Sequence, residues 1–233
     1  LAKWTVNTAD QCLKGLSASN SFNFGTSTSV ATPNSSFTKF DWTFGTNATP
    51  TAANNSSSVT GVTYSTFGLK TVTLTATDKN GCTDTFTSTV TVRDIPVASI
   101  AMSGTNATQC LQDNKFDFVS SASTAGNGAS ISTYAWKFDA QSWKNHATPD
   151  VSTTANQSGV VYDTIGNFKV RLTLTNNYGC VDTAIITLKI KENPKAKWNV
   201  NSFVQCYQGN SFNFATTLTS ASVGSSITNY SWN

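Results

Sequence analysis

Five cysteines are the residues of this chain whose type and spacing offer the clearest chemistry. They are Cys12, Cys82, Cys110, Cys180 and Cys206. Thiols can form disulfides or hold zinc, but zinc sites use clustered ligands such as CxxC pairs, whereas these cysteines are scattered singly. We therefore expect disulfides and no metal site. Because disulfides persist outside the cytosol, they predict an oxidising, extracellular location.

Catalytic chemistry has much weaker support. His146 is the single histidine, and it lies in a polar loop. A nucleophile elsewhere would therefore lack a second histidine to serve as its base. Asp84 and Asp182 each follow a turn but stand alone, so we expect them to hydrogen-bond locally rather than to act as paired carboxylates. The sequence predicts no enzyme activity and no cofactor.

The composition limits the partners that the chain can have. Charged residues form only 12% of the sequence and the net charge is +3, which gives little long-range attraction for nucleic acid. Hydrophobic residues form 38%, enough to build buried cores. No run of eighteen apolar residues is present, so no membrane insertion is expected. The first residues, LAKWTVN, read as a strand, so any export signal is expected outside this window.

An internal repeat contains the elements that must position the cysteines. Cys12 and Cys110 are 98 residues apart, as are Cys82 and Cys180, and Cys110 and Cys206 are 96 apart. Three blocks share further motifs, namely QCLKG, QCLQD and QCYQG, then SFNF, KFDF and SFNF, then FDWTF, YAWKF and YSWN. The repeat predicts domains at 1–94 and 95–193, with 194–233 as the N-terminal part of a third copy. We expect the chain to belong to a longer array.

Within one copy, apolar residues recur with the period of two that is typical of strands. Val72, Leu74 and Ala76 alternate with threonines, and no helical pattern is present. Short strands separated by turn-forming residues predict an all-β sandwich of about a hundred residues. Asn80-Gly81 fits a type I′ hairpin turn, in which both residues have positive φ. The recurring tryptophans are expected in the cores, and they are Trp4, Trp42, Trp136, Trp198 and Trp232.

These motifs together resemble a known family. An aromatic-Trp-x-Phe strand (40–44 and 134–138) followed by Tyr-x-x-x-Gly (64–68 and 162–166) is similar to PKD domains. The QC motif and the GC-x-DT behind the hairpin resemble tandem PKD-like repeats of giant Bacteroidota cell-surface proteins, such as gliding-motility adhesins. The resemblance implies Ig-like sandwiches arranged end to end, with type IX secretion. The family's Trp-Asp-Phe-Gly-Asp-Gly reads here WTFGTN (42–47) and WKFDAQ (136–141), which puts any loop-bound cation in doubt.

Strand directions in such a sandwich place the two cysteines of one copy at opposite ends. A strand of about ten residues spans roughly 33 Å, whereas a disulfide needs Cα atoms within about 7 Å. We therefore predict that Cys12 pairs with Cys180 across the domain junction. By the same rule, Cys82 pairs with a preceding unit, and Cys110 and Cys206 pair with following units. If the strand directions differ, the cysteines are reduced or pair within a domain.

Two loops and two threonines are further candidate sites. The second copy has a five-residue insertion in DAQSWKNH, where Trp143 and His146 are candidate contact residues. Packing of Trp143 against the protein itself is the alternative. The first copy has its own insertion at residues 16–19. The family resemblance implies bacterial O-glycosylation at Asp-Thr followed by an apolar residue, which predicts Thr164 and Thr183 as acceptors.

These observations lead to two hypotheses for function. The first is a spacer or shaft segment of a long secreted surface adhesin or filament, stiffened by inter-domain disulfides. Its partners are neighbouring repeats of the chain, with identical chains in a filament or surface glycans as further candidates. The alternative is a PKD-type substrate-binding module of a secreted protease or polysaccharide hydrolase. A row of exposed aromatic residues in every repeat favours that alternative, but only Trp143 is available here.

Overall fold

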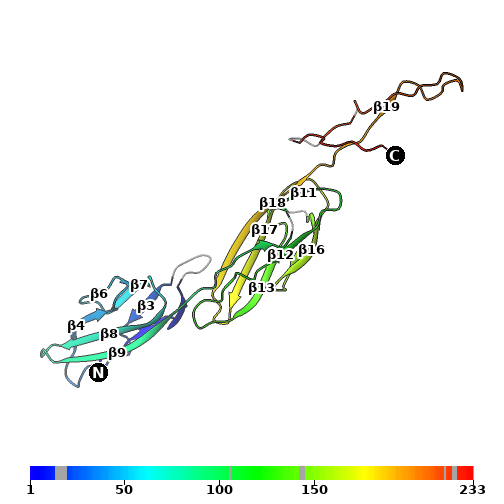
Figure 1. The fold of residues 1–233 in the computed structure, drawn as a ribbon. Helices are drawn as coiled ribbons and strands as arrows, with labels where there is room; N and C mark the ends of the chain where they lie inside the picture. Colours follow the sequence, from blue (N-terminus) through cyan, green and yellow to red (C-terminus); the bar gives the residue numbers. More distant parts are fainter. Residues whose placement is uncertain (14–19, 105, 142–144, 218, 222–224, 233) are drawn as a thin grey trace. The chain divides into compact units, whose positions relative to one another are not determined.

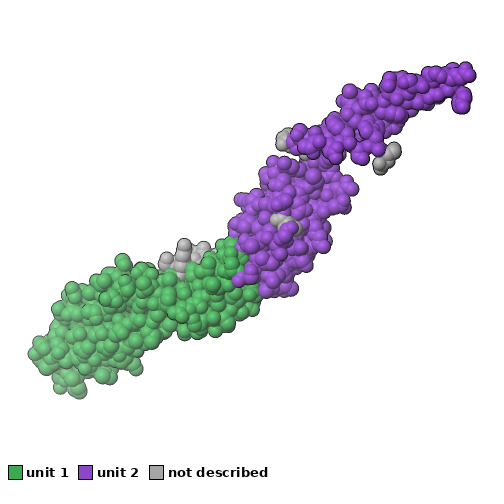
Figure 2. Space-filling model, viewed as in Figure 1, with its two compact units in different colours: residues 1–99, 122–134, 173–184 green, residues 100–121, 135–172, 185–233 purple. Residues whose placement is uncertain are grey.

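The chain folds entirely into β-structure where its elements are regular. The computed structural model describes residues 1–13, 20–104, 106–141, 145–217, 219–221 and 225–232. Every regular element in these ranges is a strand (Figure 1), which confirms the predicted all-β sandwich class. Two compact units are distinguished in Figure 2, one of residues 1–99, 122–134 and 173–184, the other of residues 100–121, 135–172 and 185–233. None of the described residues forms a helix long and apolar enough to cross a membrane.

The first copy of the repeat contains two sheets. Their hydrogen-bonded orders are β1-β3-β7-β5 and β2-β9-β8-β4-β6. The short strand β2 runs parallel to β9, whereas β8 is antiparallel to both β9 and β4. The strands are β1 (Thr5–Val6), β2 (Asp10–Cys12), β3 (Phe22–Gly25), β4 (Phe37–Thr43), β5 (Ala48–Thr49), β6 (Ala52–Ala53), β7 (Ser58–Tyr64), β8 (Gly68–Asp78) and β9 (Thr83–Arg93).

The second copy repeats this arrangement strand for strand. Its sheets have the orders β10-β12-β16-β14 and β11-β18-β17-β13-β15, and β11 again runs parallel to the last long strand, β18. The strands are β10 (Ala101–Met102), β11 (Thr108–Cys110), β12 (Phe116–Val119), β13 (Ile131–Lys137), β14 (Ala147–Thr148), β15 (Val151–Ser152), β16 (Gln157–Tyr162), β17 (Gly166–Asn176) and β18 (Val181–Lys191).

The period of two in the sequence determines which face of each long strand is buried. Along β8, Val72 and Leu74 are fully buried, while the intervening threonines point to the other face of the sheet, as successive side chains of a strand must. Thr73 lies opposite Thr87 on β9, and their hydroxyl oxygens are 3.0 Å apart. These cross-strand threonine pairs stabilise the outer face of the hairpin.

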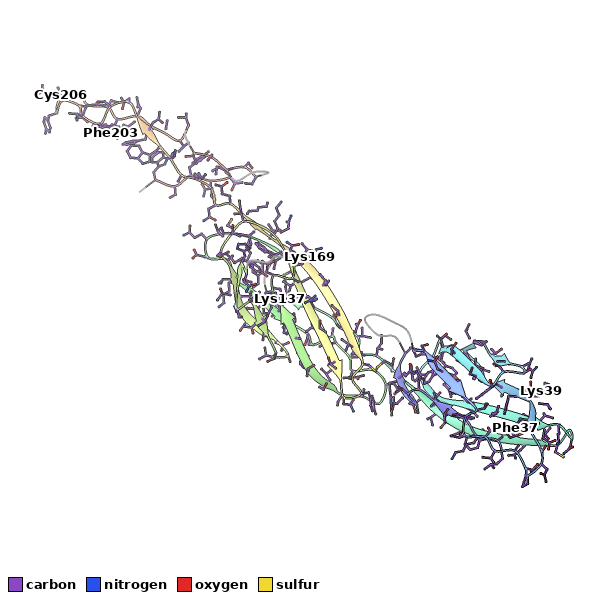
Figure 3. All side chains as sticks on the ribbon, turned by 180° about the vertical axis from the view of Figure 1, so that it is seen from behind. Phe37, Lys39, Lys137, Lys169, Phe203 and Cys206 are labelled. Atoms are coloured by element: carbon purple, nitrogen blue, oxygen red, sulfur yellow. A yellow bond between two sulfur atoms is a disulfide. The ribbon has the colours of Figure 1, made fainter. Side chains whose placement is uncertain are left out.

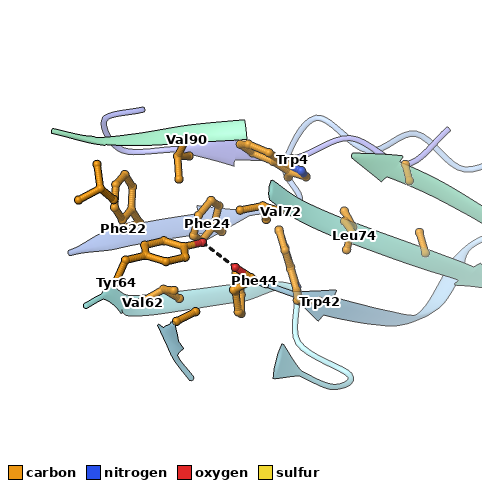
Figure 4. Close-up of a cluster of buried hydrophobic side chains, with 14 residues drawn as sticks. Trp4, Phe22, Phe24, Trp42, Phe44, Val62, Tyr64, Val72, Leu74 and Val90 are labelled. Atoms are coloured by element: carbon orange, nitrogen blue, oxygen red, sulfur yellow. Dashed lines mark hydrogen bonds between the residues drawn. The ribbon is translucent and has the colours of Figure 1, made fainter. Parts of the chain in front are cut away.

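Aromatic rings fill the space between the two sheets of the first copy (Figure 4). Trp4 meets Phe24 edge to face with ring centroids 5.4 Å apart, and Trp42 stacks on Phe44 at 5.9 Å. The buried Tyr64 hydroxyl donates a hydrogen bond to Phe44 O at 3.1 Å. The second copy has the same core, in which Trp136 stacks on Phe138 at 5.8 Å. The predicted burial of the recurring tryptophans is confirmed for Trp4, Trp42 and Trp136.

The third segment differs from the two complete copies. Its strands are β19 (Asn199–Val200) and β20 (Phe214–Ala215), which pair with each other. Trp198 and Trp232 are 51% and 52% exposed, so the prediction that they are core residues is wrong for this segment. The physical reason is that the described part of residues 194–232 has this two-stranded sheet alone, with no second sheet to cover the rings.

The turn between β8 and β9 also differs from the prediction. Gly81 has a φ of 81°, but Asn80 is not among the residues with positive φ, so the turn is not type I′. Instead, Gly81 N donates to Asp78 O at 3.0 Å and Asp78 N donates to Cys82 O at 2.9 Å. This pattern fits a three-residue hairpin loop with glycine in the left-handed region at its end.

Candidate functional site

Cys12 and Cys180 form a disulfide that joins the first copy of the repeat to the second. Their Cα atoms are 5.6 Å apart, although 168 positions separate them in sequence. Cys12 ends β2, and Cys180 lies in the turn that connects β17 to β18. Both residues belong to the first compact unit, and Cys180 is 1% exposed. The bond therefore links β2 of the first copy to the β17–β18 hairpin of the second copy.

Strand β2 determines where Cys12 lies. Its parallel pairing places Cys12 opposite Arg93, the final residue of β9, and Leu13 N donates to Arg93 O at 2.7 Å. Cys82 immediately precedes Thr83, the first residue of the same 11-residue strand. Since such a strand spans roughly 35 Å, Cys12 and Cys82 lie at opposite ends of the first copy and cannot bond to each other.

The glutamine of each QC motif closes the loop that follows the cysteine, a role that the sequence reasoning missed. Gln11 Nε2 donates to Ser21 O at 3.0 Å, and Gln11 Oε1 accepts from Ser21 N at 2.8 Å. The same pair of bonds joins Gln109 to Lys115 and Gln205 to Ser211. The glutamine side chain thus satisfies both the backbone N–H and the backbone C=O of one residue at the far end of the loop. Its recurrence in the motif was the signal that could have revealed this role.

Asn176 positions Cys180. Its side-chain oxygen accepts hydrogen bonds from the backbone N–H groups of Tyr178 (3.1 Å) and Cys180 (3.0 Å). Its side-chain nitrogen donates to Asp94 O (3.2 Å) and to Ala125 O (3.0 Å). One buried amide therefore shapes the hairpin loop and also binds the linker that leaves the first copy.

Asp78 takes the place of Asn176 in the first copy. Its Oδ1 accepts from the N–H groups of Asn80 and Cys82, both at 2.9 Å, and its Oδ2 accepts from the Ser35 hydroxyl at 2.9 Å. Burial acts to raise the pKa of Asp78, but these hydrogen bonds outweigh it and hold the pKa below its ordinary value of 3.8. Aspartate keeps the acceptors of the hairpin but lacks the donor that Asn176 offers to the linker.

Arg93 connects the two sides of the disulfide without a covalent bond. Its Nε donates to both carboxylate oxygens of Asp10 (2.8 and 2.9 Å), and its Nη2 donates to Asp10 Oδ2 (2.5 Å). The hydrogen bond with Asp10 raises the pKa of Arg93. The guanidinium also lies over the ring of Tyr178, whose hydroxyl donates to Gly128 O at 3.0 Å. We name Asp10, Arg93 and Tyr178 the junction latch.

The linker passes unusually close to a loop of the second copy. Asp94 Oδ2 accepts from Asn127 N at 2.9 Å. Gly126 has a φ of 87°, and a Cβ atom there would lie 2.6 Å from Ile95 O. Glycine is therefore required at 126 both by backbone conformation and by space.

Asp84 and Asp182 make long-range rather than local bonds, so the prediction for them is wrong. Asp84 Oδ2 accepts from Ala2 N at 2.5 Å, and Asp182 Oδ2 accepts from Ala98 N at 2.8 Å. Each carboxylate thereby holds the chain where it enters a copy, against the hairpin end of the same copy. The sequence hid this role because the bonded residues are more than eighty positions apart.

The other three cysteines are exposed thiols. Cys82, Cys110 and Cys206 are not joined to one another or to the disulfide. Cys206 is labelled in Figure 3, in the third segment. Cys82 occupies the position in the first copy that Cys180 occupies in the second, and Cys110 the position that Cys12 occupies in the first. Each therefore presents one half of the bonded arrangement seen between Cys12 and Cys180.

The insertion loop of the second copy is described only in part. Trp143 lies outside the described residues, as does the first copy's insertion at 16–19. His146 Nδ1 and Asp163 Oδ1 are 2.9 Å apart, and the imidazole lies 6.3 Å from the Phe168 ring. The histidine is therefore paired with a carboxylate rather than free in solvent.

The two predicted glycosylation residues lie in different settings. Thr164 is half-buried in the bend between β16 and β17. Thr183 is half-buried on β18, and its hydroxyl lies 3.2 Å from that of Thr173 on β17. The hydroxyl of Thr183 thus already has a cross-strand partner, which distinguishes it from a free loop acceptor.

Comparisons with known proteins give the following similarities. No protein-family model matches the chain, and no curated protein matches it. Fibronectin(III)-like modules of Clostridium thermocellum CbhA match with a TM-score of 0.38 and 10% identity over 81% of this chain and 93% of theirs. Carbohydrate-binding modules of the β-sandwich superfamily match with 0.34 and 15% over 81% and 83%. Invasin, a bacterial integrin-binding protein, matches with 0.32 and 10% over 87% and 42%.

Proposed function

We propose that the chain is a structural spacer segment of a long secreted surface protein, an adhesin or a filament, whose repeats are stapled by inter-domain disulfides. The observation that carries this proposal is the bond between Cys12 and Cys180, which joins two copies of the repeat. The segment acts mechanically rather than as an enzyme. Its partners are neighbouring repeats of the same chain.

The disulfide between Cys12 and Cys180 changes the stability of the chain and its response to force. In the chain-entropy account, closing a loop of 168 residues stabilises the folded state by about 5 kcal/mol. The short connection Asp94–Pro96 and the disulfide form two separate links between the copies. Bending at the junction must then distort both links together, and pulling cannot extend the residues inside the loop.

The junction latch supports the same role and makes this junction different from the next. At the positions of Arg93 and Asp10, the second copy has Lys191 and Thr108. Lysine lacks the planar fork that binds a carboxylate in two places and stacks on an aromatic ring. Threonine has no charge to offer. We infer that successive junctions share the staple but differ in their non-covalent contacts.

The exposed thiols extend the proposal to further units. Cys82 pairs with a cysteine of a preceding unit, and Cys110 and Cys206 pair with cysteines of following units. Exposed single cysteines in an oxidising environment would otherwise be open to reaction. The repeated motifs support PKD-like repeats of a Bacteroidota surface protein, exported by type IX secretion for gliding or attachment. Thr164 and Thr183 are its proposed O-glycosylation sites, and identical chains or surface glycans are its proposed outer partners.

Single-molecule stretching tests the mechanical role directly. The whole chain is pulled from its two ends with the disulfide intact and again after reduction. We expect reduction to release about 60 nm of additional extended length, since 168 residues contribute about 3.6 Å each. The double variant Cys12→Ser, Cys180→Ser should show the longer length without reductant, and the control Cys82→Ser should not. Equal lengths in the oxidised and reduced wild type would refute the spacer mechanism.

A further inference from the structure

Three carboxylate oxygens of the second copy are buried without hydrogen-bond partners. Asp139, in the loop after β13, is fully buried, and neither of its carboxylate oxygens has a partner. Oδ1 of Asp150 is also buried and unpartnered. An unpaired buried charge is strongly unfavourable, and native proteins normally pair it or use it to bind a metal ion. These oxygens therefore require a physical explanation.

The two residues are neighbours where β13 and β15 end their pairing. Phe138 N donates to Asp150 O at 2.9 Å, just beyond the β13–β15 pairs Trp136–Ser152 and Lys137–Val151, so Asp139 follows directly after the residue that faces Asp150. Burial raises the pKa of Tyr162, and the charges of Asp139 and Asp150 raise it further. The Tyr162 hydroxyl donates to Phe138 O at 2.6 Å, so it is held at the residue that directly precedes Asp139.

The first copy shows that the fold does not need these acids. There, Phe44 N donates to Thr51 O at 2.9 Å, and the Tyr64 hydroxyl donates to Phe44 O. This scaffold matches that of the second copy bond for bond, yet Gly45 and Thr51 stand where Asp139 and Asp150 lie. Burial by itself raises the pKa of Tyr64, to about 12. The second copy therefore carries an added feature on a shared scaffold.

Neighbouring side chains leave one oxygen of Asp150 free. Lys137 Nζ, labelled in Figure 3, pairs with Asp150 Oδ2 and also donates to Asn145 Oδ1. This arrangement orients the Asp150 carboxylate in the manner of an outer-shell partner at a metal site. Lys137 thus occupies Oδ2 of Asp150 and leaves Oδ1 for another partner.

We propose that Asp139 and Asp150 bind a calcium ion, with both oxygens of Asp139 and Oδ1 of Asp150 as ligands. Oxygen donors select hard cations, and calcium accepts bidentate carboxylates with carbonyls and water in a flexible shell, whereas magnesium demands a stricter octahedron. No group of three or more His, Cys, Asp or Glu side chains that could hold a metal ion occurs in the described ranges, so carbonyls and water must supply the other ligands. Asp139 is not an acidic position of the Trp-Asp-Phe-Gly-Asp-Gly motif, where Lys137 and Ala140 stand instead.

Calorimetric titration of the whole chain with calcium chloride, after treatment with a chelator, tests this site. We expect one ion per chain with a dissociation constant of about 0.1–1 mM, the range typical of extracellular calcium modules. Asp139→Asn should abolish binding and Asp150→Asn should weaken it at least tenfold. Asp113→Asn is the matched control, because Asp113 is exposed and asparagine tolerates its φ of 60°.

Thermal melting supplies a second readout that does not depend on heat of binding. Calcium should raise the melting temperature of the wild type and of Asp113→Asn but leave Asp139→Asn unchanged. Without calcium, Asp139→Asn should melt higher than the wild type, because it removes the unpaired charge. A wild type that neither binds calcium nor melts higher with it, or an Asp139→Asn variant that binds like the wild type, would overturn the site. Magnesium chloride serves as the competing cation, and equal binding of both ions would overturn the assignment to calcium.

Discussion

The guanidinium carbon of Arg93 lies 4.1 Å from the centroid of the Tyr178 ring, so the end of β9 stacks on the hairpin that carries Cys180. Arg93 is also the strand partner of Cys12. The latch therefore holds the two sulfur-bearing segments in place by contacts that do not depend on the sulfur atoms. This relationship leads to a first prediction about the redox behaviour of the junction.

Arg93→Ala should make the Cys12–Cys180 disulfide easier to reduce. Without the latch, the two thiols spend less time close together, and their effective concentration falls. We expect a shift of roughly 3- to 10-fold in the thiol–disulfide equilibrium, from one cation–π contact and one ion pair at a partly exposed site. Equilibration in glutathione buffers followed by alkylation and mass spectrometry measures it. The equilibrium of Arg93→Lys should lie between those of the wild type and Arg93→Ala. Lys191→Ala is the control and should leave the equilibrium unchanged. An unchanged equilibrium in Arg93→Ala would contradict the role of the junction latch.

Gly126→Ala should destabilise the junction by about 1–3 kcal/mol, and by more than Gly128→Ala does, because the new Cβ atom would collide with the linker in addition to straining the backbone. The new Cβ atom would lie 2.6 Å from Ile95 O. Gly128→Ala is a matched control, because Gly128 also has positive φ but has open space around its Cβ position. Urea unfolding monitored by fluorescence compares the two. Equal losses in both variants would show that backbone strain, and not the close approach to the linker, explains the requirement.

The stability of the β8–β9 hairpin should depend on pH through Asp78. Since hydrogen bonds hold its folded-state pKa below 3.8, the carboxylate stabilises the fold above pH 3.8, and that contribution is lost as pH falls through the lower folded-state value. Asp78→Asn should keep the hairpin and remove this part of the acid sensitivity, because Asn176 performs the same backbone role in the second copy. Asp78→Ala should lower the melting temperature of the first copy by about 5 °C. Amide exchange at Asn80 and Cys82 between pH 3 and 6 follows the effect, and identical profiles for wild type and Asp78→Asn would contradict it.

Asp182→Ala should release the chain where it enters the second copy. The variant loses the acceptor for Ala98 N and leaves a partly buried donor unpaired, at a cost of about 1–2 kcal/mol. Faster amide exchange at Ala98, with β13 unchanged, is the expected result. Asp84→Ala should have the same effect at Ala2 in the first copy. If exchange at Ala98 is unaltered, the carboxylate does not anchor this segment.

The repeated, local features of the sequence predict the fold well. Paired sheets with aromatic cores can be predicted from three features. These are the alternation at Val72 and Leu74, the recurring Trp42 and Trp136, and the short turns between strands. These features succeed because each depends on residues a few positions apart, or on a period that the second copy repeats. The exposed Trp198 and Trp232 show the limit, because burial also requires a covering sheet that a motif alone does not supply.

The non-covalent contacts between residues far apart in sequence were not predictable. Arg93 and Tyr178 are far apart in sequence, and neither recurs at the equivalent position of the other copy, so no pattern connected them. The turn at Asn80-Gly81 differed because the Asp78 side chain supplies bonds that a two-residue turn does not need. Asp139 looked like an ordinary loop residue, since its burial without partners depends on the packing of β13 against β15.

Non-reducing peptide mapping of the intact protein tests the central claim most directly. The chain is digested at low pH without reductant, and linked peptides are identified before and after reduction. We predict one linked pair that contains Cys12 and Cys180 and disappears on reduction, with Cys82 absent from it. Recovery of Cys12 linked to Cys82, or of Cys12 and Cys180 as separate thiol peptides from oxidised protein, would contradict the stapled junction.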